Sequence, residues 1–374
     1  MSDARIPVCE PALDGNELTY ITDAVRSGWI SSGGDYLRRF EEGFARYVGV
    51  GQGIGTTSGT TALHLALAAL GVGPGDEVII PDFTMIASAF AVCYCGAMPV
   101  FVDADPETWN MDVDQLAAKI GPRTKAIMAV HIYGHPTDMD PLLALARERG
   151  IAVLEDAAEA HGALYKGRHC GSLADLAAFS FYANKAITTG EGGMVVTDDV
   201  ALAEECRLLR NLSFPRTGGR VYLHERIGFN YRMSNLQGAL GLAQLERIDT
   251  YLDARRAHAA RYGERLAAIR ALQLPAERPW ATNSYWMYGV VLRDEVALGR
   301  DELAAALAAE GIETRPFFQP MHVQPALLRY GASGAGAYPV ADRLAARGLY
   351  LPSGSDLSDA QIDRVCDAVA RHLA

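Results

Sequence analysis

Residues 180–193, Ser180-Phe-Tyr-Ala-Asn-Lys185-Ala-Ile-Thr-Thr-Gly-Glu-Gly-Gly193, place a lysine between an apolar run and a turn rich in threonine and glycine. The run from Leu176 to Tyr182 predicts a buried strand, so Lys185 follows its carboxyl end, where open α/β sheets bind ligands. Partial burial lowers the pKa of a lysine from the usual ~10.4 and leaves more free amine to attack an aldehyde. Pyridoxal phosphate bonds to lysine by this reaction. Taken alone, Lys185 is better explained as a surface residue of a loop, and only the segments around it favour the cofactor role.

Two upstream segments provide partners for the other parts of such a cofactor. The run from Ile151 to Leu154 predicts a strand that leads to Asp156. A carboxylate beside the pyridine nitrogen keeps the ring protonated, and the protonated ring withdraws electrons from a carbanion. The segment Thr56-Thr-Ser58-Gly59-Thr60-Thr61 opens a predicted helix, whose first N–H groups can bind phosphate. For Asp156 the alternative is the N-cap of a helix that follows the strand.

Composition excludes several other classes of protein. The chain has 45 acidic and 34 basic residues and a formal net charge of −11, which argues against nucleic-acid binding. Its six cysteines have no C-x-x-C or zinc spacing, so we expect reduced thiols in a cytoplasmic protein. The uncharged stretch from Met85 to Val102 contains Gly96 and Pro99, which indicate a helix followed by a buried strand. We therefore expect no membrane association, and the N-terminus has no apolar run typical of a signal peptide.

Helical segments and short apolar strands alternate from residue 51 to about 196. This pattern predicts an α/β fold with a mainly parallel, doubly wound sheet between flanking helices. A long helix is expected from Asn235 to about Leu272. We predict a large domain at residues 1–272, including an N-terminal arm, and a smaller C-terminal α+β domain at 273–374. The segment Pro275 to Pro279 is the expected linker.

Three further motifs extend the comparison to nearly the whole chain: Gly28-Trp-Ile-Ser-Ser-Gly33, Gly228-Phe-Asn-Tyr-Arg-Met-Ser-Asn235 and Arg315-Pro-Phe-Phe-Gln-Pro-Met-His322. With the segments above, they resemble the sugar aminotransferases of the DegT/DnrJ/EryC1/StrS family, which have the type I fold of pyridoxal-phosphate enzymes. The resemblance implies pyridoxal 5′-phosphate as cofactor, L-glutamate as amino donor and a nucleotide-linked keto sugar as acceptor. Within the family, the chain is most similar to the group that aminates C4 of GDP-4-keto-6-deoxymannose to form GDP-perosamine.

The resemblance also implies roles for individual residues. Lys185 is the expected catalytic lysine, and Asp156 is expected at the pyridine nitrogen. The cofactor phosphate is expected to bind backbone N–H groups of Gly59 and Thr60 and the hydroxyl of Ser180. A buried strand serine bonded to backbone is the alternative for Ser180.

Glu159 is expected near the phenolic oxygen of the cofactor, at a position where many members of the family have glutamine. A carboxylate there requires a proton on one of the two groups, and perosamine-forming enzymes resemble this chain in having glutamate. Alternatively, Glu159 completes a capping box with the backbone of Asp156. Met85 occupies a position where relatives have an aromatic ring stacked on the cofactor, so such stacking is not expected here.

Asn230 matches an asparagine that reaches the cofactor phosphate of a neighbouring subunit, which implies a homodimer with shared active sites. A turn residue is the alternative. The motifs also imply that Trp29, Ser31 and His322 face the substrate, although Trp29 could equally be a packing aromatic.

Other functions remain to be compared. A sugar dehydratase of this fold would have histidine in place of Lys185. A 3-keto sugar or inosose aminotransferase, or a non-catalytic binding or regulatory protein of the same fold, is an open alternative. His131 and His135 have the i, i+4 spacing of a helical metal pair, but Gly134 and Pro136 disfavour a helix and no third ligand is evident, so we predict no metal site.

Overall fold

The computed structural model describes residues 5–214, 222–332 and 336–373. Its β-strands are β1 Gln52–Thr56, β2 Glu77–Pro81, β3 Met98–Val102, β4 Thr124–Val130, β5 Ala152–Asp156, β6 Leu164–Tyr165, β7 Arg168–His169, β8 Leu176–Ser180, β9 Gly193–Thr197, β10 Leu272–Gln273, β11 Ala281–Thr282, β12 Tyr288–Leu292, β13 Arg315–Pro316 and β14 Gly348–Leu351.

The α-helices are α1 Glu17–Ser27, α2 Asp35–Val48, α3 Gly59–Ala69, α4 Ile86–Tyr94, α5 Leu116–Lys119, α6 Met139–Arg149, α7 Val200–Arg210, α8 Asn235–Leu245, α9 Ile248–Leu266, α10 Arg300–Ala309, α11 Pro325–Tyr330, α12 Pro339–Arg347 and α13 Asp359–Leu373. Short 3-10 turns are η1 Val113–Gln115, η2 Ile132–Gly134 and η3 Met321–Val323. None of these helices has the length and apolar character needed to cross a bilayer.

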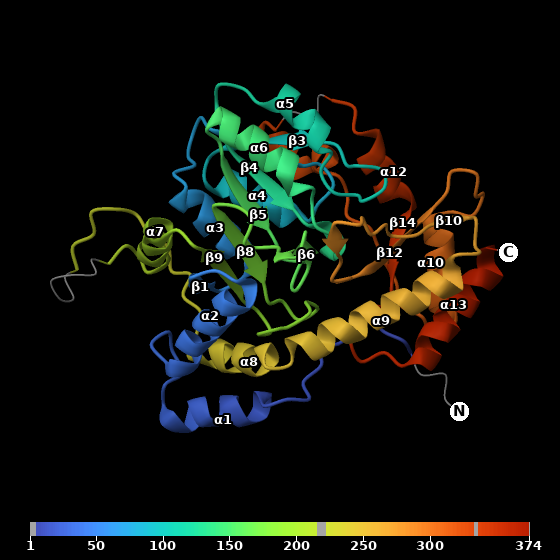
Figure 1. The fold of residues 1–374 in the computed structure, drawn as a ribbon, viewed down its shortest axis with the longest axis horizontal. Helices are drawn as coiled ribbons and strands as arrows, with labels where there is room; N and C mark the ends of the chain where they lie inside the picture. Colours follow the sequence, from blue (N-terminus) through green and yellow to red (C-terminus); the bar gives the residue numbers. More distant parts are fainter. Residues whose placement is uncertain (1–4, 215–221, 333–335, 374) are drawn as a thin grey trace.

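A seven-stranded sheet forms the centre of the molecule, in the order β1-β9-β8-β5-β4-β2-β3 (Figure 1). The pairs β3–β2, β2–β4, β4–β5 and β5–β8 are parallel, whereas β9 runs antiparallel to both of its neighbours. The expected mainly parallel sheet is therefore confirmed. The reversed direction of β9 follows from the loop after β8, which returns the chain along the same edge instead of crossing through a helix.

Successive side chains of a strand point to opposite faces of this sheet, and the two faces pack into different hydrophobic clusters. In β5, Val153 packs with the cluster that includes Leu142 of α6, while Leu154 packs with the cluster that includes Leu65 of α3. In β8, Phe179 joins a third cluster with Phe40 of α2. Helices thus cover both faces, which explains why the strands are short, apolar and buried.

A smaller antiparallel sheet, β10-β12-β14-β13, follows in the C-terminal part. Residues from α9, α10 and α13 pack against it in one cluster that includes Tyr262, Leu307 and Val365. This agrees with the expected smaller α+β unit. Its contacts with the rest of the chain include the pairing of β11 with β6 and a bridge between Ile6 and Ile312. The boundary between residues 272 and 273 stays a prediction.

The long helix expected from Asn235 to Leu272 is wrong, because the chain forms two helices, α8 and α9, and ends the second at Leu266. The junction contains neither proline nor glycine. It is held by the N-terminal segment: Glu246 accepts hydrogen bonds from Asn16 and Tyr20 at 2.9 and 2.7 Å. Those partners lie more than two hundred residues away in sequence, so local periodicity could not reveal the break.

Candidate active site

A cavity of about 350 Å³ lies where the carboxyl ends of β5 and β8 meet the first turn of α3. This volume suits a small-molecule ligand. Six residues implicated by the sequence line the cavity together: Gly59, Thr60, Asp156, Glu159, Ser180 and Lys185. Their common location follows from the sheet, since ends of neighbouring parallel strands open at one edge.

Lys185 lies in a loop that folds back on the end of β8. Its backbone N–H donates to the carbonyl of Tyr182 at 2.9 Å, and the N–H of Phe181 donates to the carbonyl of Gly192. The side chain is only 10 % exposed, and its Nζ lies 3.9 Å from Oε1 of Glu159. Burial lowers the pKa of the Lys185 amine. The loop therefore presents a partly desolvated amine to the cavity, as a nucleophile requires.

Asp156, the last residue of β5, is fixed by two donors. Ser88 Oγ donates to its Oδ2 at 2.8 Å, and the N–H of Ala158 donates to its Oδ1 at 3.2 Å. No helix starts at Asp156, so the N-cap alternative is wrong. Burial raises the pKa of this carboxyl, while the Ser88 hydroxyl acts in the opposite direction. A cation beside the free side of the carboxylate would offset the cost of its burial.

Glu159 receives its hydrogen bond from a distant loop. The N–H of Tyr133 donates to Oε2 of Glu159 at 2.7 Å, and Tyr133 holds a left-handed φ of 52° in η2. The capping-box alternative is therefore wrong, because the carboxylate points to Tyr133 instead of the backbone of Asp156. Burial raises the pKa of Glu159 to about 7. Near neutral pH this carboxyl can therefore carry a proton.

The first turn of α3 forms a cradle for an anion. Ser58 caps the helix: its Oγ accepts from the N–H of Thr61 at 3.2 Å, and Thr61 Oγ1 accepts from the N–H of Ser58 at 2.9 Å. The N–H groups of Gly59 and Thr60 remain directed out of the helix end. A Cβ on Gly59 would lie 2.7 Å from Cβ of Ser180, so only glycine allows this approach.

Four residues that the motifs assigned to the site lie elsewhere in the described chain. Asn230 is exposed and pairs with Asn211 in an isolated bridge. Trp29 is 63 % exposed, and Ser31 lies in a separate surface hollow with Arg210. His322 is tied to another part of the fold, since its Nδ1 lies 2.6 Å from Oδ2 of Asp82. Their roles stay predictions.

Several residues of the cavity had not been anticipated from sequence. Trp286, Phe318 and Tyr350 from the C-terminal part line it, as do Asn184 and Glu191 from the loop of Lys185. Met85 also lines the cavity and is 45 % exposed. Phe318 lies in the motif from Arg315 to His322, whereas Trp286 and Tyr350 occur in apolar runs that equally fit a core.

Comparison with known proteins decides the family. The model of the DegT/DnrJ/EryC1/StrS aminotransferase family matches residues 11–370. The chain belongs to this aminotransferase family. It is 48 % identical over 375 residues to a GDP-perosamine synthase of Caulobacter vibrioides, with 100 % of both chains covered. It is 44 % identical to a GDP-perosamine synthase of Escherichia coli O157:H7, with 97 % of both covered. Among solved structures, DesV of S. venezuelae matches with a TM-score of 0.90 and 39 % identity, over 96 % of this chain and 94 % of that one.

Aminotransferases of the DegT/DnrJ/EryC1/StrS family depend on pyridoxal 5′-phosphate, and the cavity fits that group. The donors at the start of α3 suit its phosphate, and the buried carboxylate of Asp156 suits a protonated ring nitrogen. The amine of Lys185 opens into the same cavity. A cofactor with an anion, a cation and an aldehyde therefore finds a complementary group for each.

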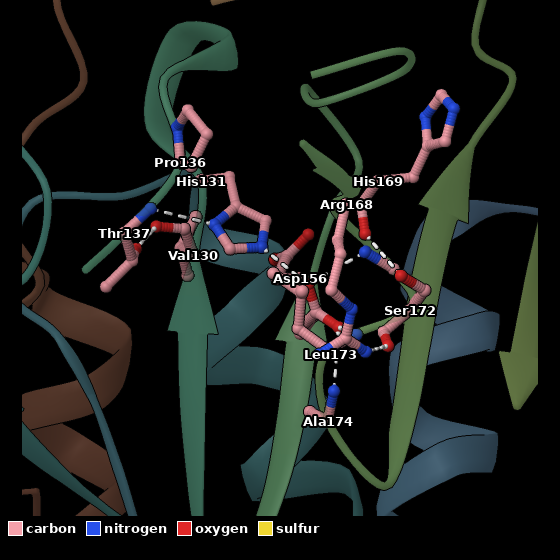
Figure 2. Close-up of polar contacts among 12 residues, drawn as sticks. Val130, His131, Pro136, Thr137, Asp156, Arg168, His169, Ser172, Leu173 and Ala174 are labelled. Atoms are coloured by element: carbon pink, nitrogen blue, oxygen red, sulfur yellow. Dashed lines mark hydrogen bonds and ion pairs between the residues drawn. The ribbon is translucent and has the colours of Figure 1, made fainter. Parts of the chain in front are cut away.

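A separate buried cluster lies on the other side of β5 from Asp156. Ligand atoms of His131, Glu155 and Cys170 lie within 4.8 Å of one another. However, the N–H of Thr137 donates to Nδ1 of His131 at 3.0 Å, so the ring proton is on Nε2, which donates to Glu155 at 2.9 Å (Figure 2). A metal would have to displace that proton. The hydrogen bonds thus indicate a polar network, and the absence of a metal site stays a prediction.

Proposed function

We propose that the protein transfers the amino group of L-glutamate to C4 of GDP-4-keto-6-deoxymannose and forms GDP-perosamine. The observation that carries this proposal is the match to two GDP-perosamine synthases at 48 and 44 % identity over essentially the whole of each chain. Matches of this length include every segment that lines the cavity. Perosamine-forming enzymes resemble this chain in having glutamate at the position of Glu159, which supports the same substrate.

Lys185 is the proposed catalytic residue. Bound pyridoxal phosphate supplies an aldehyde for the amino group and a protonated ring that withdraws electrons from the adjacent carbon. The Lys185 amine would hold the cofactor through that aldehyde and would be free when glutamate is bound there instead. The free amine would carry a proton from the α-carbon of glutamate to the cofactor and, in the second half-reaction, from the cofactor to C4 of the sugar. Its lowered pKa favours the form that accepts a proton.

The remaining residues position and stabilise charge. Asp156, held by Ser88, provides the anion that keeps the ring nitrogen protonated. Gly59 and Thr60 bind the phosphate through N–H groups, and Ser180 adds its hydroxyl. Glu159 offers a protonated carboxyl to the phenolic oxygen, which removes the repulsion between two anions.

The functional unit in this proposal is a homodimer with shared active sites. Asn230 is exposed and forms an isolated bridge with Asn211, the residue after α7. Its neighbours Tyr222, Leu223 and Ile227 are 75, 68 and 90 % exposed, so several apolar side chains gather there without cover in a single chain. A second copy that buried them would bring Asn230 to its cofactor phosphate. In the assembled dimer, the proposed contacts with the sugar nucleotide come from the exposed Trp29 and from Ser31 and His322.

We also propose that the enzyme acts in the cytoplasm, because its cysteines are free and cysteines stay reduced in that compartment.

A single assay tests the proposed function. Purified protein with pyridoxal phosphate and L-glutamate is supplied with GDP-4-keto-6-deoxymannose, and the nucleotide products are resolved by mass spectrometry. Formation of a GDP-linked 4-amino sugar with matching 2-oxoglutarate supports the proposal. Amination of only a 3-keto sugar or an inosose, or of nothing, contradicts it.

A further inference from the structure

The amine of Lys185 lies over the face of an aromatic ring. Its Nζ is 3.6 Å from the ring centroid of Trp286, a residue that is 4 % exposed. In the described part of the chain, the carboxylate within 4.0 Å of this nitrogen is that of Glu159, at 3.9 Å. That separation is too long for a hydrogen bond. The indole face is therefore the closest favourable surface for a positive charge on Lys185.

Trp286 is fixed in this position from three sides. Its Nε1 donates to the carbonyl of Asn184 at 2.8 Å, and its own carbonyl accepts from Nη1 of Arg255 at 2.7 Å. Its ring also stacks with Tyr133, at 6.2 Å between centroids and 25° between planes. Because Asn184 precedes Lys185, the indole is attached to the backbone that carries the amine. The ring thus occupies one defined place relative to the lysine.

The groups around Lys185 differ in how they affect the stability of its ammonium form. Burial disfavours the ammonium form and is the largest influence on its pKa. The neighbouring groups Glu159, Asp156 and Cys9 raise the pKa of Lys185. Arg255 lowers it. The carboxyls of Glu159 and Asp156 both have raised pKa values, so their charge depends on pH. The attraction of the indole ring for a cation does not depend on pH.

We propose that Trp286 is a positioning residue, whose indole face holds the Lys185 ammonium over the cavity whenever the lysine is not bonded to the cofactor. The inference rests on the proposed role of Lys185. During turnover the amine gains a proton from one carbon and later gives a proton to another, so each reaction cycle returns it to its starting state. Between these transfers the ammonium is held against Trp286, and the proton stays within the cavity.

The test measures the pKa of Lys185 in the full-length, cofactor-free protein. Wild-type and variant proteins react with trace acetic anhydride across a pH series, and mass spectrometry quantifies each labelled lysine. The chain has four lysines, so exposed Lys125 serves as an internal reference. We expect Trp286→Leu to lower the pKa of Lys185 by about one unit, a tenfold change in the proportion of free amine. Trp286→Phe, which retains an aromatic face, restores part of the shift.

A control variant, Trp280→Leu, removes an indole that packs on His135 and Tyr165 and should leave the pKa of Lys185 unchanged. Should Trp286→Leu fail to fold, replacement of the four tryptophans by 5-fluorotryptophan weakens the ring's attraction for a cation at nearly constant size, and a smaller decrease of the same sign is expected. An unchanged or raised pKa in either case overturns the inference. Failure of the proposed function would appear separately, as absence of amination by the wild-type enzyme.

Discussion

Glu155 provides a quantitative test of how the structure supports the site. Its carboxylate is fully buried beside Asp156 in β5 and accepts four hydrogen bonds. Oε2 accepts from His131 Nε2 at 2.9 Å and from the N–H of Gly171 at 2.7 Å, while Oε1 accepts from the N–H groups of Leu173 and Ala174 at 2.8 and 3.1 Å. Figure 2 shows His131 on one side of β5 and Leu173 and Ala174 on the other. The carboxylate thus joins β4 to the loop before β8.

Glu155→Ala leaves four donors without an acceptor, two of them buried and two partly buried. Each such loss costs about 1 kcal/mol at the low end of the measured range, so we expect the free energy of unfolding to fall by about 4 kcal/mol. That is a large fraction of the stability of an ordinary domain. Glu155→Gln replaces one oxygen by a donor that faces two N–H groups, and should cost about half as much, ~2 kcal/mol.

Urea unfolding of the cofactor-free proteins, compared at equal slope, measures these differences. Glu148→Ala is the control: Glu148 pairs with its neighbour Arg149 and is 69 % exposed, so its loss should cost well under ~1 kcal/mol. The reasoning is refuted if Glu155→Ala is destabilised by less than ~1 kcal/mol, or if Glu155→Gln matches the wild type.

Three further outcomes are expected. Asp156→Asn should retain bound cofactor but lower kcat by 10²- to 10³-fold, because the anion beside the ring nitrogen is lost; cofactor absorbance and steady-state rates measure both, and a loss below about tenfold would contradict the role. Burial lowers the pKa of His161 to about 3, so its neutral form is favoured in the folded state and its contribution to stability is lost as pH falls from 6.5 toward 3. His161→Phe should therefore reduce the dependence of unfolding free energy on pH between 6.5 and 4, by up to ~1.4 kcal/mol per pH unit, and urea curves with an unchanged dependence would disagree. Mixing inactive Lys185→Ala with inactive Asn230→Asp should restore activity in heterodimers, one of whose shared sites carries neither change; no recovery despite proven subunit exchange would exclude shared sites.

Local patterns in the sequence were sufficient for the sheet and much of the cavity. The apolar runs from Ile151 to Leu154 and from Leu176 to Tyr182 predicted strands, and the polar residues Asp156 and Lys185 after them predicted a ligand site at one sheet edge. The glycine and hydroxyl residues at the start of α3 predicted an anion cradle. The structure brings these residues together around one cavity, because strand ends and helix starts have local signals.

Features that depend on distant contacts could not be predicted. The break between α8 and α9 is held by residues of the first helix and its preceding segment. Ser88 reaches Asp156 across 68 residues, and Trp286 reaches the Lys185 loop across about a hundred. The residues next to Ser88 or Trp286 in the sequence do not indicate which distant residue each of them contacts.

The covalent bond between Lys185 and the cofactor tests the central claim most directly. Pyridoxal phosphate is added to the purified protein, the complex is reduced with borohydride, and peptide mass spectrometry locates the pyridoxyl group among Lys119, Lys125, Lys166 and Lys185. The account predicts one modified residue, Lys185, and loss of the modification when glutamate is added before reduction. Modification of another lysine, or none at stoichiometric level, would contradict it.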